Sequence, residues 1–119
     1  MTRDEILALE GPALAVAVAE RVMGERIMAI PRVGYVIAPV DGSWKSLPRY
    51  PEDIAAAWQV VERMREMGLR PIIVSDWNEQ WLCEVYRKSE WVAQSRWYNS
   101  APRAICEAAL LAVMGEGEV

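Results

Sequence analysis

Apolar residues recur with a helical period most clearly in the segment 51–68. One apolar stripe follows the i, i+3, i+4, i+7 spacing that places side chains on a single face of a helix, while glutamate and arginine fill the other face. The members of this stripe are Ile54, Ala57, Trp58, Val61 and Met64. Pro51 suits the first turn, and Gly68 provides the left-handed residue that ends the helix. We expect the rest of the chain to pack around this helix, with Trp58→Ala costing about 3 to 5 kcal/mol.

Two other apolar helices are predicted near the ends of the chain. Residues 2–5 have the pattern of a capping box that opens a short first helix. The segment 13–23, rich in alanine and valine, continues as a helix that Gly24 ends. Helices that are apolar nearly all round are covered either by other layers of the fold or by another subunit, and the sequence leaves both possibilities open.

The last helix is predicted to begin at Ser100, a favoured capping residue, with a core stripe of isoleucine and alanine. Leucine and valine widen its apolar surface well beyond one stripe. Arg103 and Glu107, four residues apart, are expected to form an ion pair on its exposed edge. Because the helices at both ends carry more apolar surface than a monomer of this size needs to cover, we expect a homo-oligomer.

Strand-forming residues occupy five short runs, at 27–30, 33–40, 72–77, 81–87 and 91–98, with turn residues between them. The segment 44–50 between strands and helix has no period and is expected to be a loop. The order of elements predicts an α/β (α+β) sandwich with a mainly antiparallel sheet of about five strands packed with three helices. We expect a single domain over residues 1–114 and a frayed tail at 115–119.

Charge and composition exclude several classes of function. The chain has 13 basic and 17 acidic residues and a net charge of -4, without a basic stripe, so non-specific nucleic-acid binding is disfavoured. It contains no histidine, the commonest general base and metal ligand, and neither a metal site nor a cofactor is expected. Cys83 and Cys106 are expected to be reduced core thiols, which suits a cytoplasmic protein. The apolar runs are too short for a membrane span.

Aromatic and basic residues form the main candidate site. Tryptophan rings offer faces on which a base can stack, and arginine offers a fork that fits phosphate. The candidate ligand-binding residues are Trp44, Lys45, Arg49, Tyr50, Trp77, Trp81, Arg87, Trp91, Arg96 and Trp97. Composition leaves three interpretations open: core and strand residues, a protein-binding surface, or a pocket for a small ligand.

Three segments carry a resemblance to a known family. They are residues 1–7 (MTRDEIL) with 19–24 (AERVMG), residues 50–62 (YPEDIAAAWQVVE) and residues 101–113 (APRAICEAALLAV). In this order they resemble the phage ABA-sandwich domain family, small proteins encoded by bacteriophages and prophages. The resemblance implies the fold and a viral origin. It implies no reaction, because the family brings no agreed catalytic residues to carry over.

The resemblance and the missing catalytic groups together predict a protein that binds and does not catalyse. We expect a phage accessory protein of the host cytoplasm that inhibits antiviral defence by sequestering a small nucleotide signal. One alternative is an inhibitor or adaptor whose exposed aromatic strands bind a host protein. Another is a structural role in the virion.

Overall fold

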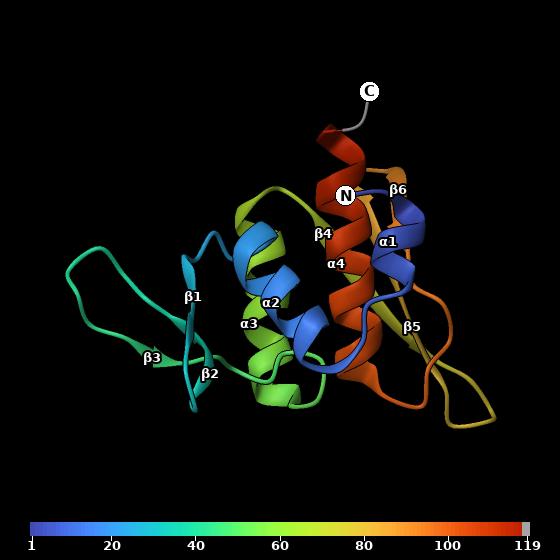
Figure 1. The fold of residues 1–119 in the computed structure, drawn as a ribbon. Coiled ribbons are helices and arrows are strands. Elements are labelled where there is room, and N and C mark those ends of the chain that lie inside the picture. Colours follow the sequence, from blue (N-terminus) through green and yellow to red (C-terminus); the bar gives the residue numbers. More distant parts are fainter. Residues whose placement is uncertain (118–119) are drawn as a thin grey trace.

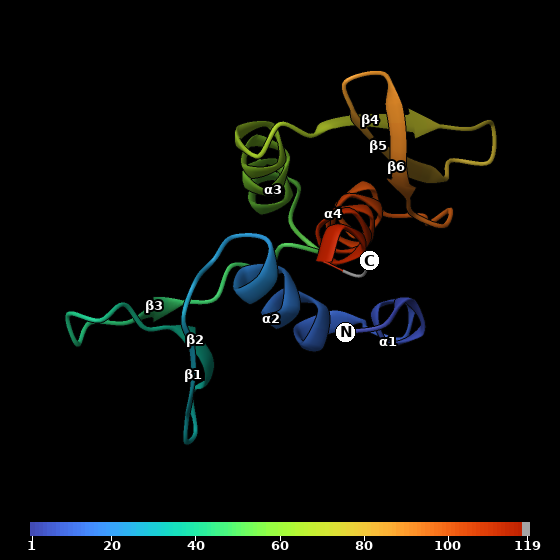
Figure 2. The ribbon, with the colours of Figure 1, turned by 90° about the horizontal axis from the view of Figure 1, so that it is seen from above.

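Two three-stranded antiparallel sheets lie on either side of a layer of helices in the computed structural model (Figures 1 and 2). The structure describes residues 1–117, with the side chains of 1–114. The predicted α+β sandwich with antiparallel pairing is confirmed, but its strands form two sheets where the sequence suggested one sheet of about five strands.

The helices are α1 (Arg3–Leu7), α2 (Gly11–Arg21), α3 (Ile54–Glu66) and α4 (Ala101–Gly117). Sheet A consists of β1 (Ile27–Ile30), β2 (Gly34–Ile37) and β3 (Lys45–Ser46), and sheet B of β4 (Arg70–Ser75), β5 (Trp81–Arg87) and β6 (Glu90–Gln94). The expected loop at 44–50 thus contains a short strand. Helix α4 continues to Gly117, into the tail that was expected to fray, and residues 118–119 of that tail lie outside the described part of the chain.

Helix α4 is the centre of the fold. It contacts α1, α2, α3 and all three strands of sheet B. Every residue from 104 to 112 is buried, as its nearly continuous apolar surface requires. The chain therefore packs around α4, not around α3 as the sequence suggested. The apolar surface of α4 is covered within one copy of the chain, so any association between copies must use other surfaces.

Helix α3 ends as predicted, but it begins at Ile54, after the predicted first turn at Pro51, and it buries a different face. Asp53 caps it by accepting a hydrogen bond from Ala55 N at 2.9 Å, so Pro51 lies before the helix. At the other end Gly68 has φ +81°, and Leu69 N donates to Met64 O at 2.9 Å in the expected Schellman arrangement.

The buried face of α3 consists of Ala56, Ala57, Val60, Val61 and Met64, whereas Ile54 and Trp58 are 55% and 50% exposed. The predicted role of Trp58 at the centre of the core is therefore wrong. Two overlapping stripes satisfy the same spacing, and the one with smaller side chains lies on the alanine-rich surface of α4, where the two helices can approach closely.

Sheet A, with its connecting turns, forms an arm (residues 27–46) that projects from the helices (Figure 2). It contacts α2 through β1. The predicted antiparallel pairing of its first two strands is confirmed. Its exposed large apolar side chains are Met28, Val33, Tyr35, Val40 and Trp44. The arm therefore presents an apolar surface that the described part of one chain leaves open.

Sheet B covers α4 with one face. Cys83, Val85 and Ala93 on this face are buried in the core. Strand β5 has the predicted bounds. Strand β6 ends at Gln94, before its predicted end at residue 98. Beyond Gln94, Tyr98 forms an isolated antiparallel bridge with Trp81. The strand order β4-β5-β6 leaves β4 and β6 as the two edges of the sheet.

Candidate functional site

The ten candidate ligand-binding residues do not line one pocket. Trp44 and Lys45 lie on the arm, Arg49 and Tyr50 before α3, Trp77 in the β4–β5 turn, Trp81 and Arg87 at the ends of β5, Trp91 on β6, and Arg96 and Trp97 between β6 and α4. Arg49 and Trp91 line two different hollows. Tyr50 is only 2% exposed and belongs to the core. The aromatic and basic residues of the last strands are thus distributed over the surface, because successive side chains on a strand point to opposite faces.

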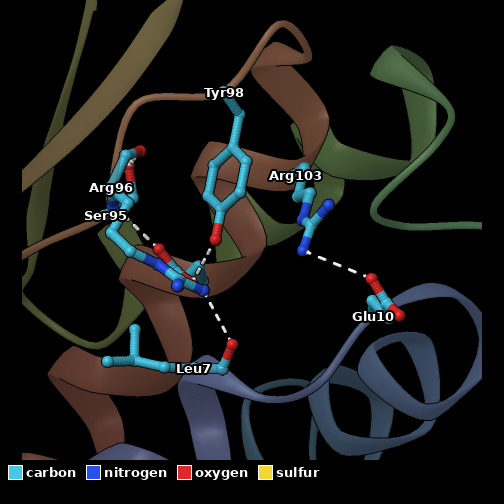
Figure 3. Close-up of polar contacts among 7 residues, drawn as sticks. Leu7, Glu10, Ser95, Arg96, Tyr98 and Arg103 are labelled. Atoms are coloured by element: carbon cyan, nitrogen blue, oxygen red, sulfur yellow. Dashed lines mark hydrogen bonds and ion pairs between the residues drawn. The ribbon is translucent and has the colours of Figure 1, made fainter.

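Glu107 on α4 accepts hydrogen bonds from Arg96 and Tyr98, whose side chains Figure 3 labels. The residue is 2% exposed. Its Oε2 accepts a hydrogen bond from Arg96 N at 2.8 Å, and its Oε1 accepts from Arg96 Nη2 at 2.8 Å and from Tyr98 OH at 2.6 Å. We call these three residues, Arg96, Tyr98 and Glu107, the Glu107 clasp. The predicted exposed pair of Arg103 with Glu107 is wrong, because α4 is surrounded by other elements and leaves Glu107 no exposed edge.

The clasp joins three parts of the chain. Arg96 Nη2 also donates to Leu7 O at 2.7 Å, which ties α1 to the segment before α4. Burial, followed by the hydrogen bond to Glu107, raises the pKa of Tyr98. Both oxygens of Glu107 are occupied by protein donors, so the carboxylate is arranged to hold the fold together and is poorly placed to act on a substrate.

The two cysteines are free and buried, as the sequence predicted. Burial raises the pKa of the Cys83 thiol from 9.0 to about 12, and it raises the pKa of Cys106 as well. Since the thiolate is the nucleophilic form, neither residue is prepared for covalent chemistry at neutral pH.

Raised thiol pKa values predict a loss of stability in alkaline solution. Above pH 9.0, the ordinary value, the unfolded chain releases thiol protons that the folded chain still holds. The thiol contribution to the free energy of unfolding should therefore be constant below pH 9.0 and fall above it, by up to about 1.4 kcal/mol per pH unit for each thiol. Urea unfolding followed by circular dichroism at increasing pH would measure this slope. The Cys83→Ala variant should give a shallower decline, and an unchanged slope would contradict the assignment.

A groove runs past the start of α2 and is the candidate binding site. Its first part is a hollow of about 370 Å³ between α2, the arm and the segment before α3. The hollow is lined by Gly11, Pro12, Ala15, Val33, Gly34, Tyr35, Leu47, Pro48, Arg49, Pro51 and Glu52. This volume and the mostly apolar lining are typical of sites that hold a small organic ligand.

The second part of the groove is a hollow of about 650 Å³ that shares Gly11, Pro12, Pro51 and Glu52 with the first. It is lined additionally by Glu10, Asn99, Ser100 and Arg103. The two hollows thus form one continuous surface around the first turn of α2. We refer to both together as the α2 groove.

Two arginines stand in the α2 groove, each beside a glutamate. Arg49 Nε lies 3.5 Å from Glu52 Oε2, and Arg103 Nη2 lies 3.8 Å from Glu10 Oε2 (Figure 3 shows the second pair). The Arg103 guanidinium also lies 4.3 Å from the centre of the Tyr98 ring. Ion pairs of this kind with exposed partners contribute little, so either guanidinium can be redirected to a bound anion at low cost.

The sequence pointed to Arg49 but missed the other notable groups of the groove. Tyr35, 53% exposed, lies on β2 with its neighbour Val36 buried. Strand alternation gave no signal for this orientation, because Tyr35 shares its face of β2 with Ile37, which is buried. Pro12 and Arg103 reach the groove only through the packing of α2 against α4, for which the local sequence gives no pattern.

Two further observations concern the part of the chain that the structure describes. Among residues 1–114, whose side chains the structure describes, there is no cluster of acidic or cysteine side chains that could hold a metal ion. Within residues 1–117, no helix has both the length and the apolar character needed to cross a membrane.

Comparison with known proteins agrees with this fold. The model of a family described as the phage ABA sandwich domain matches residues 16–110. No curated protein matches the sequence. The structure is similar to the crystal structure of a phage protein from Bacillus cereus ATCC 14579, with a TM-score of 0.73 and 22% sequence identity over 89% of this chain and 94% of that chain. A likeness at this level of identity concerns the fold alone.

Proposed function

The chain belongs to the phage ABA sandwich domain family, and from that premise we propose that it is a phage accessory protein that sequesters a small nucleotide in the α2 groove. In this proposal it acts in the host cytoplasm by withholding a nucleotide signal from an antiviral defence, without altering the signal chemically.

The observation that carries the proposal is the composition of the groove. Tyr35 supplies a half-exposed aromatic face on one wall, and Arg49 supplies a guanidinium whose side chain is 81% exposed. A base stacked on the ring would leave its phosphate within the region of the arginine side chains. Apolar walls from Pro12, Leu47 and Pro48 would exclude water from the base.

The first turn of α2 supports an anion at the same place. The Glu10 side chain makes no capping hydrogen bond and Pro12 has no amide hydrogen, so the first donors of this 11-residue helix are the amides of Gly11 and Ala13, which Glu10 does not cap. The positive end of the helix dipole favours a phosphate at this position. The Arg103 guanidinium stands in the adjoining hollow, near both Glu10 and the Tyr98 ring.

Ligand capture from infected cells tests the proposal. The purified protein is incubated with an extract of infected cells, washed and heated, and the released small molecules are identified by mass spectrometry. We expect an intact nucleotide from the wild type. Tyr35→Ala should weaken binding about 5- to 150-fold, because base stacking on an aromatic ring is worth about 1 to 3 kcal/mol, and Arg49→Ala should weaken it further for ligands with more phosphate.

Trp77→Ala is the matched control, because this ring is fully exposed in the β4–β5 turn, on the far side of the helices from the arm (Figure 2). It should leave capture unchanged. Release of a chemically altered nucleotide would overturn the proposal in favour of an enzyme. Capture of one host protein, lost in Trp44→Ala and kept in Tyr35→Ala, would instead favour an inhibitor of a host protein that binds the exposed apolar side chains of the arm.

A further inference from the structure

Strand β4 is an edge of sheet B with hydrogen-bonding groups directed away from the sheet. Asp76 N donates to Gln80 O, towards β5, so the alternation of a strand directs the backbone groups of Ser75, Ile73 and Pro71 to the open side. Proline has no amide hydrogen and occupies a position where β5 requires none. Unpaired groups of this kind form a template on which another strand can pair.

The sequence of this edge is complementary to itself in the antiparallel direction. If two copies of β4 are related by a two-fold axis at Ile73, Arg70 of one copy lies opposite Asp76 of the other. Ile72 lies opposite Val74 on the same face of the sheet. Opposite charges and apolar pairs at directly facing positions both stabilise antiparallel strands. The register thus brings complementary residues together at two sets of facing positions, 70 with 76 and 72 with 74.

Apolar surface flanks this edge. Ile54 and Trp58 on α3 are 55% and 50% exposed, and Ile72 on β4 is 38% exposed. A hollow of about 440 Å³ separates α3 from the first half of β4 and leaves room beside the strand for another chain. Trp58, Arg65, Leu69 and Ile73 are among the residues that line it.

We propose that two copies of this chain associate through their β4 strands, about a two-fold axis at Ile73, and form one continuous antiparallel sheet. The amide of Ile73 in each copy donates to the Ile73 carbonyl of the other. The amide of Ser75 in each copy donates to the Pro71 carbonyl of the other, and the missing amide of Pro71 removes no bond that β4 makes with β5. The surface is separate from the α2 groove, so the proposal stands independently of ligand binding.

Matched proline substitutions on the two edges of sheet B test the association. Ser75→Pro removes an amide that points to the open side of β4, so the single chain should fold normally while the association is lost. Gln94→Pro makes the same change on β6, where Ser95 N and Cys83 O pair next to it and the Gln94 amide faces outward. Light scattering should give twice the 13.4 kDa chain mass for the wild type and for Gln94→Pro, and 13.4 kDa for Ser75→Pro.

Circular dichroism of the three proteins should be the same, which shows that each remains folded. A wild type of 13.4 kDa at all concentrations, or a dimer that persists in folded Ser75→Pro, would overturn the proposal. Should Ser75→Pro fail to fold, hydrogen exchange in the wild type decides. Protection of the Ile73 and Ser75 amides should rise with protein concentration, and protection that is independent of concentration would also overturn it.

Disulfide cross-linking tests the register. Directly facing positions on antiparallel strands are close enough for a disulfide, whereas diagonal positions lie about 7 to 8 Å apart. Mild oxidation of a mixture of Ile72→Cys and Val74→Cys should therefore give covalent dimers that contain one chain of each kind. Either variant oxidised alone should give few. Equal cross-linking with and without mixing would overturn the two-fold axis at Ile73.

Discussion

Replacing Arg96 by methionine should lower the free energy of unfolding by about 3 to 5 kcal/mol, the usual cost of leaving a buried charge without its partner. The Glu107 carboxylate, 2% exposed, would keep the hydrogen bonds from Tyr98 and from the backbone of residue 96 but lose the guanidinium. Loss of the bond to Leu7 O would also loosen α1. Urea unfolding followed by circular dichroism measures the change.

Arg103→Met is the matched control for this prediction. Its guanidinium lies 3.8 Å from Glu10, whose side chain is 77% exposed, and 4.3 Å from the centre of the Tyr98 ring, so the variant should lose about 1 to 2 kcal/mol. The double variant Arg96→Met with Glu107→Gln should be more stable than Arg96→Met alone, because no charge is left buried. The amide oxygen can accept from the backbone N–H of residue 96, and the amide NH2 can donate to the Tyr98 hydroxyl oxygen. If the two variants lose the same free energy of unfolding, the Glu107 clasp stabilises the fold no more than an exposed ion pair does.

On α3, Met64→Ala should cost about 2 to 5 kcal/mol, whereas Trp58→Ala should cost only about 1 kcal/mol. Met64 is fully buried against the core, and its truncation leaves a cavity that the neighbouring helices cannot close. Trp58, 50% exposed, already has much of its ring in water. The outcome decides which face of α3 holds the fold.

Both variants are best compared in the Ser75→Pro background. Trp58 lines the hollow beside β4, so its loss could also weaken association between copies. With association removed, chemical unfolding reports the fold of the single chain. A greater loss for Trp58→Ala than for Met64→Ala would restore the sequence-based assignment of the core.

Local chemistry explains which elements the sequence predicted well. The capping box of α1 forms between Thr2 and Glu5, and the Schellman arrangement after α3 forms at Gly68, because both depend on residues close in the chain. The bounds of β5 follow from the turn residues on either side of it. These features need no knowledge of the rest of the fold.

Tertiary packing decided what the sequence did not predict. Two apolar stripes on α3 satisfy the same period, and only the position of α4 selects the one with Ala57 and Val60. Glu107 is paired with Arg96, which lies 11 positions away, and not with the residue one turn earlier on its own helix. The division of the strands into two sheets likewise depends on long-range pairing that period and composition do not encode.

The candidate site was predictable to a smaller extent. Arg49 was recognised because an arginine beside aromatic residues suits a nucleotide, and the structure places it in the α2 groove. Tyr35 was overlooked because it lies in a strand-forming run that reads as core. Segments far apart in sequence build the groove, and their meeting is a property of the folded chain.

The exposure of the tryptophans determines which spectroscopic probe suits this molecule. Five of the six indole side chains are exposed, namely Trp44, Trp58, Trp77, Trp91 and Trp97. Trp77 is fully exposed and the other four rings are 42% to 55% exposed, so denaturation should shift the fluorescence spectrum only modestly. The same property makes the indoles sensitive reporters of encounters at the surface, because any molecule that covers one of them moves its emission to the blue.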